Sequence, residues 1–146
     1  MAPGRVLALD VGDARIGVAV SDPTGLIATP GQAIVRSDIA FDIDAVLSIA
    51  QEAGVVRIIV GLPLTLAGRT GAQARSVREF CGILRSRTDL PVETYDERLS
   101  TVEAARGLRA AGVRASRDRG RLDSASAAVI LQSYLKSGSN RRTGKQ

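Results

Sequence analysis

Three acidic residues that lie far apart in the sequence stand at the ends of predicted elements. Asp10 follows the apolar residues 6–9, Glu97 follows an extended segment, and Asp123 opens a predicted helix. An apolar run of this length, stopped by Gly12, is typical of a strand buried on both faces, where an unpaired charge costs several kcal/mol. Asp10 therefore requires a partner, which can be an arginine, a set of backbone amides or a metal ion.

Carboxylates gathered in one pocket repel one another, which raises their pKa values and destabilises the site until a cation neutralises them. Mg²⁺ and Mn²⁺ suit such a cluster because both favour carboxylate oxygens. Two such ions, about 4 Å apart, can activate a water and stabilise the leaving oxygen of a phosphodiester. We therefore predict that Asp10, Glu97 and Asp123 are catalytic and bind Mg²⁺ or Mn²⁺.

Other chemistries are excluded by composition. The chain has no histidine and one cysteine, so a histidine base, a cysteine-rich zinc site and an intrachain disulfide are ruled out. That cysteine, Cys81, follows Phe80 in a helical pattern and is expected in the core.

Simpler interpretations of the three acids stay open. Asp10 can pair with Arg15 or accept turn amides, and Asp123 can be an ordinary helix N-cap. Asp96 competes with Glu97. Because neighbours on an extended strand point to opposite faces, only one of the two is expected to reach a metal directly, and we favour Glu97.

The elements that must position these acids follow from the apolar periodicity. Strands are predicted to about residue 10 and over 16–21, 26–35, 55–63 and 90–96. The third is interrupted by Pro30 and Gly31, which is typical of an edge strand. Helices are predicted from the Asp38 cap to Gly54, over 72–87, from a capping box over 101–111, and over 123–136.

This order of elements predicts one α/β domain over residues 1–136, followed by a disordered basic tail over 137–146. Parallel crossovers are right-handed, so the first strand should be central in a mixed five-stranded sheet with helices on both faces. Such an arrangement matches the ribonuclease H-like fold. The carboxyl ends of the first and last strands would then share one edge, where open sheets place their sites.

Positive charge is concentrated in the second half of the chain. Residues 1–95 carry a net charge of −1 and residues 96–146 carry +6, which together make the total of +5. Segment 113–121 has too few apolar residues to pack and is predicted to be a mobile loop. Either codon bias or a nucleic-acid partner explains the basic half, and clustering favours phosphate binding by Arg114, Arg117, Arg119 and Arg121.

Three further arginines are candidates for phosphate contacts: Arg15, Arg69 and Arg98. Arg69 lies in a glycine-rich loop that lacks the Gly-Lys-Ser/Thr ending of a nucleotide-binding loop, so a plain surface loop is an equal interpretation. Arg98 either contacts the scissile phosphate or neutralises Asp96. No stretch approaches the roughly 20 apolar residues needed to span a bilayer, and we expect a soluble, cytoplasmic protein.

Four segments, in this order, resemble the YqgF family, also called RuvX or Holliday junction resolvase-like: LALDVGDARIGVAVSD, IIVGLPLTLAG, VETYDERLST and LDSASAAVILQSYL. The match runs from about Arg5 to Leu135. The resemblance implies a ribonuclease H-like fold, a cytoplasmic bacterial protein and an acidic site at Asp10, Glu97 and Asp123. Thr65 and Ala67 stand where the family often has Asn and Asp, so a polar substrate contact there is not carried over.

The resemblance also implies a function, namely processing of the 5′ end of pre-16S rRNA during ribosome biogenesis. Our leading hypothesis is therefore a metal-dependent endonuclease acting on the ribosomal RNA precursor. Cleavage of branched DNA such as a Holliday junction, and a noncatalytic RNA-binding role in ribosome assembly, are the alternatives. A sugar kinase or actin-like ATPase is disfavoured because it needs two such domains. Monomer and homodimer both stay open.

Overall fold

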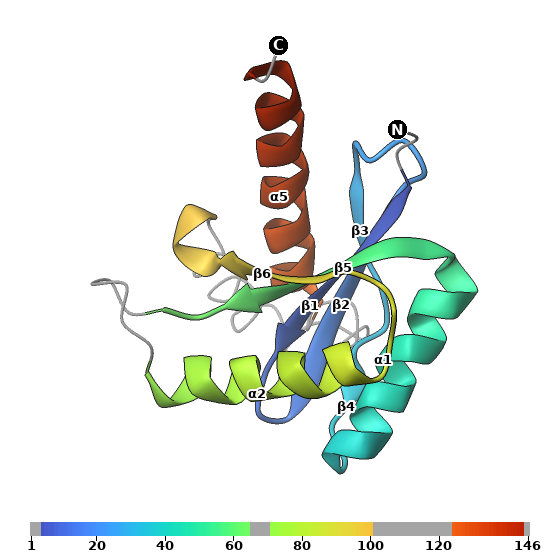
Figure 1. The fold of residues 1–146 in the computed structure, drawn as a ribbon, viewed down its shortest axis with the longest axis vertical. Helices are drawn as coiled ribbons and strands as arrows, with labels where there is room; N and C mark the ends of the chain where they lie inside the picture. Colours follow the sequence, from blue (N-terminus) through green and yellow to red (C-terminus); the bar gives the residue numbers. More distant parts are fainter. Residues whose placement is uncertain (1–3, 65–70, 101–123, 145–146) are drawn as a thin grey trace, which may run out of the picture.

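The computed structural model describes residues 4–64, 71–100 and 124–144, in which one mixed sheet lies between helices (Figure 1). Six strands form the sheet: β1 (Arg5–Val11), β2 (Arg15–Ser21), β3 (Ala28–Pro30), β4 (Ile34–Val35), β5 (Val55–Leu62) and β6 (Val92–Asp96). The helices are α1 (Ile39–Ala53), α2 (Ala72–Ser86), the short 3₁₀ turn η1 (Glu97–Leu99) and α5 (Ala125–Gly144).

Strand β1 is central, as predicted. The sheet order is β3-β2-β1-β5-β6, and β4 pairs with β2 beside this path. β1 pairs antiparallel with β2 and parallel with β5, which in turn pairs parallel with β6. The carboxyl ends of β1, β5 and β6 therefore lie along one edge of the sheet.

The third predicted strand is two short strands instead of one. β3 and β4 both pair with β2, and the chain between them makes a bond from the Gly31 amide to the Val18 carbonyl at 2.9 Å. Pro30 has no amide hydrogen to continue the ladder, so pairing breaks there and resumes at Ile34. The prediction of an edge position is confirmed, but the prediction of one strand over 26–35 is wrong.

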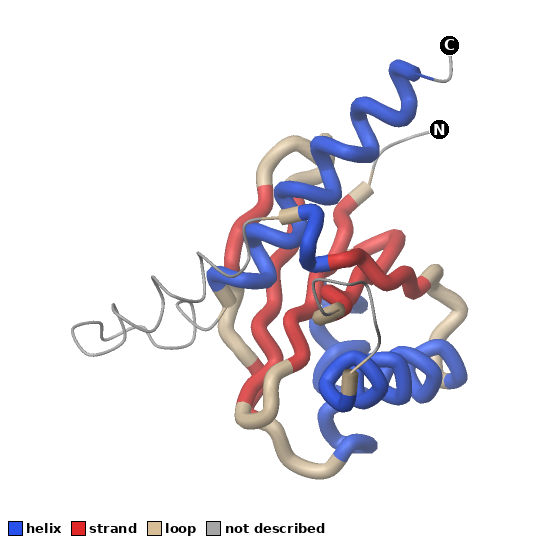
Figure 2. The backbone as a smooth tube through the Cα atoms, turned by 90° about the vertical axis from the view of Figure 1, so that its left-hand side faces the viewer, coloured by secondary structure: helices blue, strands red, loops and turns tan. Residues whose placement is uncertain are grey.

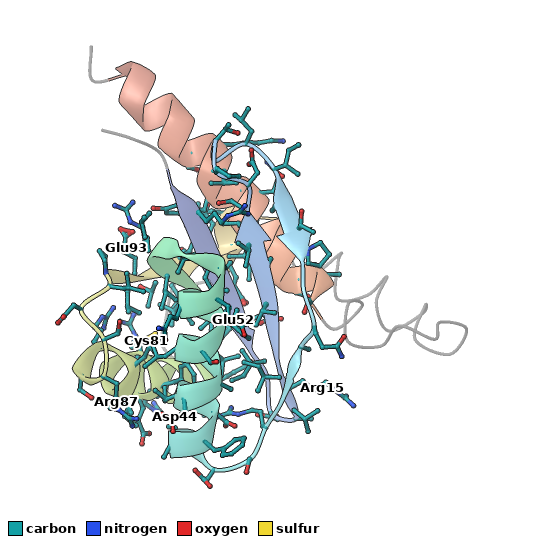
Figure 3. The ribbon with its side chains drawn as sticks, turned by 90° about the vertical axis from the view of Figure 1, so that its right-hand side faces the viewer. Arg15, Asp44, Glu52, Cys81, Arg87 and Glu93 are labelled. Atoms are coloured by element: carbon teal, nitrogen blue, oxygen red, sulfur yellow. The ribbon has the colours of Figure 1, made fainter. Side chains whose placement is uncertain are left out.

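The helices lie on both faces of the sheet, with α5 on one side and α1 and α2 on the other (Figure 2). Asp38 caps α1 by accepting the Phe41 amide at 2.8 Å, and Gly54 ends α1 in the left-handed conformation at φ 65°. Both caps are those predicted. The α2 helix carries Cys81, which is fully buried as expected, and burial raises the pKa of its thiol (Figure 3).

The residues of β1 alternate between two apolar cores. Leu7, Leu9 and Val11 pack with α1 and α2, whereas Val6 and Ala8 pack with α5. A strand with apolar contacts on both faces reads as a continuous apolar run, which is why the sequence lacks the alternation of a half-exposed strand.

The α5 helix is longer than the predicted helix, since it continues to Gly144. Its backbone thus includes residues 137–144, for which we predicted a disordered tail. Elongating an existing helix is far easier than nucleating one, so a polar sequence can continue a helix that packing has already formed. The predicted helix over 101–111 and the predicted loop over 113–121 lie outside the described residues. In the part that is described, no helix is long and apolar enough to span a bilayer.

Candidate active site

Asp10 is the penultimate residue of β1 and is 6% exposed. It pairs with Gly17 of β2 in the antiparallel ladder. Because side chains alternate along a strand, Asp10 shares a face with Val6 and Ala8, which pack against α5. Asp10 therefore lies late in the central strand, as predicted, and on the face of the sheet that α5 covers.

Glu97 begins the η1 turn directly after β6 and is 7% exposed. Its side chain reaches back over β5. A Cβ atom added to Gly61 would lie 2.9 Å from Glu97 Oε1, which is inside van der Waals contact. Only a residue without a side chain leaves room for the Glu97 carboxylate at this position.

The register brings Asp10 and Glu97 to the two sides of Gly61. Leu9 pairs with Val60, so the next residues along the parallel ladder are Asp10 and Gly61. Asp10, Gly61 and Glu97 each lie two residues beyond a residue of the core on the α5 side of the sheet. Those core residues are Ala8, Ile59 and Tyr95, respectively. Two buried carboxylates thus lie on one face at the carboxyl edge of the sheet, and carboxylate oxygens are donors that suit a hard divalent cation.

Asp96, which competed with Glu97 as a candidate ligand, pairs with Arg98. Its Oδ2 lies 2.5 Å from Arg98 Nη2, and its Oδ1 accepts the Arg98 amide at 2.9 Å. These hydrogen bonds from Arg98 hold the pKa of Asp96 below its usual value. Arg98 thus neutralises Asp96, which is one of its two predicted roles, while its side chain stays 38% exposed.

Asp123 lies outside the described residues, and the residue after it, Ser124, is anchored to β2. The Ser124 hydroxyl accepts the Val18 amide at 3.0 Å, and the Ser124 carbonyl accepts the Ala128 amide at 3.0 Å in the first turn of α5. Val18 is the neighbour of Gly17, which pairs with Asp10. The start of α5 is therefore anchored beside the strand segment that carries Asp10.

Of the arginines predicted to bind phosphate, Arg15 and Arg98 lie within the described residues. Arg15 opens β2 and is exposed at the hairpin end, where its side chain points away from the sheet (Figure 3). Alternation along β2 puts Arg15 on the same face as Gly17 and Ala19, which is the face of Asp10. The others lie outside the described residues: Arg69, Arg114, Arg117, Arg119 and Arg121.

A buried ion pair that the sequence analysis missed fixes the loop after Asp10. Arg36 Nε lies 3.1 Å from Asp42 Oδ2, and Arg36 Nη1 donates to the Gly12 carbonyl at 3.0 Å. Asp42 is fully buried and also accepts the Ser37 amide at 2.9 Å. A signal was present in the sequence, because Asp42 lies on the apolar stripe of α1, four residues before Val46.

Within the described ranges no group of three or more acidic, histidine or cysteine side chains is close enough to hold a metal. Two of the three predicted ligands, Asp10 and Glu97, fall inside these ranges, and the third falls outside them. The described part of the site is thus a pair of carboxylates.

Comparison with known proteins identifies relatives of the whole domain. The profile of the RuvX family, described as Holliday junction resolvase, matches residues 4–137. A Mycobacterium tuberculosis protein named "Putative pre-16S rRNA nuclease" is 47% identical over 133 residues, which cover 90% of this chain and 78% of the relative. A Mycobacterium leprae protein of the same name is also 47% identical, over 90% of this chain and 72% of that protein.

Solved structures share the fold at low sequence identity. Thermus thermophilus RuvC in complex with a Holliday junction substrate aligns with a TM-score of 0.59 and 15% identity, over 92% of this chain and 96% of RuvC. Fowlpox virus resolvase with Holliday junction DNA aligns with a TM-score of 0.52 and 12% identity, over 91% and 97% of the two chains. The fold is therefore ribonuclease H-like, and the family match over residues 4–137 shows that this chain belongs to the RuvX family.

Proposed function

We propose that this chain is a metal-dependent endonuclease whose site consists of Asp10, Glu97 and Asp123. As a member of the RuvX family, the chain is a hydrolase acting on phosphodiester bonds. The observation that carries the proposal is the presence of two buried carboxylates on one face at this edge of the sheet, with Glu97 over Gly61 and Asp10 on the neighbouring strand β1. Two buried carboxylates on one face repel each other, and a divalent cation bound by both would relieve that repulsion, so this pair fits a site for Mg²⁺ or Mn²⁺.

The backbone around Asp10 and Glu97 holds the two carboxylates in place for a cation. Asp10 is held by the central strand, and Glu97 is held by a short turn over Gly61. Both carboxylates are shielded from bulk water, which strengthens their electrostatic attraction for a cation. When bound, a divalent cation would supply Lewis-acid activation of the attacking water and stabilisation of the leaving oxygen.

Asp123 is proposed as the third ligand. It immediately precedes Ser124, whose hydroxyl is bonded to the Val18 amide beside the partner of Asp10. One peptide unit spans about 3.8 Å between Cα atoms, and this short link to Ser124 supports the choice of Asp123.

Nucleic-acid phosphates would be bound by arginines around this edge. Arg15 supports this proposal because it lies on the Asp10 face of β2 and is exposed. We propose the same role for Arg98 and for the arginines outside the described residues: Arg69, Arg114, Arg117, Arg119 and Arg121. Replacing Arg15 with alanine is expected to reduce the slope of log affinity against log salt by about 1.

The proposed substrate is the ribosomal RNA precursor, cleaved in the cytoplasm at the 5′ end of 16S rRNA. The names of the 47% identical mycobacterial relatives support this choice. A four-way DNA junction is the second candidate, and it is supported by the description of the RuvX family.

The proposal is tested by incubating the purified protein with pre-16S rRNA and with four-way DNA junctions, with and without Mg²⁺ or Mn²⁺. Asp10→Asn is expected to lower the metal-dependent cleavage rate at least about 100-fold while leaving the protein folded. Asp44→Asn is the matched control, because Asp44 pairs with Arg87 at 2.6 Å on the exposed surface of α1 (Figure 3). The wild-type cleavage rates on pre-16S rRNA and on the four-way DNA junction rank the two substrates.

Two results would contradict the proposal. Full cleavage by Asp10→Asn would show that this carboxylate is not part of the machinery. Tight RNA binding by the wild-type protein, with no cleavage in either metal, would instead favour a noncatalytic role in ribosome assembly.

A further inference from the structure

Ser126 has a buried hydroxyl without a hydrogen-bond partner in the part of the chain that the structure describes. Among buried side-chain polar atoms of the described residues, two lack a hydrogen-bond partner, Arg57 Nε and Ser126 Oγ. Arg57 Nε still lies 3.5 Å from Glu93 Oε2, whereas Ser126 is fully buried without such a neighbour. Buried hydroxyls almost always have a partner, and a helical serine can bond the carbonyl four residues back. A buried hydroxyl without one is a candidate for a role in a site.

The stripe of α5 that contains Ser126 faces β5 and β6. Ile130 lies one turn further along, and its Cδ1 would be 2.6 Å from a Cβ added to Gly61. Ser133 lies two turns along, bonded to the Tyr95 hydroxyl at 2.7 Å and to the Leu99 carbonyl at 3.1 Å. Residues at i, i+4 and i+7 share one side of a helix, so Ser126 is on the side that covers Gly61 and Glu97.

The direction of α5 brings Ser126 to the edge of the sheet where the acids lie. Ser124 bonds Val18, which pairs with Leu9 near the end of β1. The Gln132 side chain, two turns later, accepts a hydrogen bond from the Ala28 amide at 3.2 Å. Ala28 pairs with Ser21 at the end of β2, which is the level where β1 begins. The helix thus runs antiparallel to β1, and its first turns lie over the carboxyl edge that carries Asp10 and Glu97.

We propose that Ser126 is a positioning residue of the acid site. Its hydroxyl donates a hydrogen bond to the Glu97 carboxylate when a divalent cation is bound, and so fixes the orientation of that ligand. Glu97 extends from a single 3₁₀ turn rather than from a central strand, so a further hydrogen bond adds to what orients its carboxylate. Hydrogen bonds to ligating carboxylates are a general means of orienting them. This inference rests on the proposed function.

The test compares Ser126→Ala with Ser126→Thr by titrating Mn²⁺ into the full-length chain and measuring affinity by calorimetry. Ser126→Ala is expected to weaken Mn²⁺ binding about 10-fold or more, and threonine, which keeps the hydroxyl, is expected to restore most of it. In chelator, urea unfolding of Ser126→Ala should occur at the same or a higher urea concentration, because alanine removes an unsatisfied buried hydroxyl.

Ser133→Ala is the matched control on the same stripe. It removes the bonds to Tyr95 and Leu99, so it should lower the urea midpoint but leave Mn²⁺ affinity unchanged. Wild-type affinity in Ser126→Ala, with affinity lost in Asp10→Asn, would overturn the role of Ser126 and leave the proposed function intact. Equal affinity in wild type and Asp10→Asn would overturn both.

Discussion

Gly61 gives the sharpest test of the site geometry, through the substitution Gly61→Ala. The new methyl group would lie 2.6 Å from Ile130 Cδ1 and 2.9 Å from Glu97 Oε1. Both neighbours are the ends of flexible side chains, so the fold can accommodate the change by moving them. The effect should therefore fall on the carboxylate more than on the fold.

The size of the effect follows from these distances. Ordinary contact begins at 3.4 Å, so Glu97 Oε1 must retreat by about 0.5 Å and Ile130 Cδ1 by about 0.8 Å. Overpacking of this kind costs about 1–3 kcal/mol of unfolding free energy. Because a misplacement of about 1 Å can reduce a rate about 100-fold, the retreat of Glu97 predicts a loss of about 10-fold in metal-dependent cleavage.

The assay measures metal-dependent cleavage of the preferred substrate and urea unfolding for Gly61→Ala. Gly82→Ala is the control, since a Cβ at Gly82 meets nothing within 4 Å in the middle of α2. The free energy of unfolding of this control should rise by about 0.5–1 kcal/mol, because alanine favours a helix more than glycine does. Its cleavage activity should stay unchanged. Unchanged cleavage by Gly61→Ala would refute the placement of Glu97 over Gly61.

Three further outcomes follow from the fold. Asp42→Ala leaves the Arg36 guanidinium without its buried partner and should cost about 3–5 kcal/mol in urea unfolding; a loss below about 1 kcal/mol would contradict the ion-pair argument. The Thr24 hydroxyl and the Ile27 amide hold the pKa of Asp22 below its usual 3.8, so its ionised form stabilises the fold above pH 3.8. Asp22→Asn should therefore be less stable than wild type at neutral pH, and the gap between their unfolding free energies should narrow as pH falls below 3.8; a constant gap would argue against this. Gly54→Ala forces alanine into the left-handed conformation at φ 65° and should cost about 1–2 kcal/mol, measured by thermal unfolding.

Much of the fold could be predicted because local patterns and topology agree. The apolar run of β1, the caps at Asp38 and Gly54, and the stripe of α2 each identified their elements. The break between β3 and β4 was harder to predict, because a proline marks where pairing stops but not where it resumes. The continuation of α5 beyond residue 136 was also missed, since polar composition says little about elongation of an existing helix.

The candidate site was only partly predictable. A charge directly after an apolar run singled out Asp10, which is buried, and the expectation that Asp96 and Glu97 point apart fits the pairing of Asp96 with Arg98 and the burial of Glu97. The roles of Gly61 and Ser126 depend on which strands pair, on their register and on how α5 crosses them. Those are relations between distant segments, which no local pattern contains.

The most direct test of the central claim is a crystal of the protein soaked in MnCl₂, with anomalous difference maps calculated at the manganese edge. The account predicts a strong anomalous peak between the carboxylates of Asp10 and Glu97, with Asp123 as a further ligand. Ordered Asp10 and Glu97 side chains with no anomalous peak between them would contradict the metal-dependent nuclease.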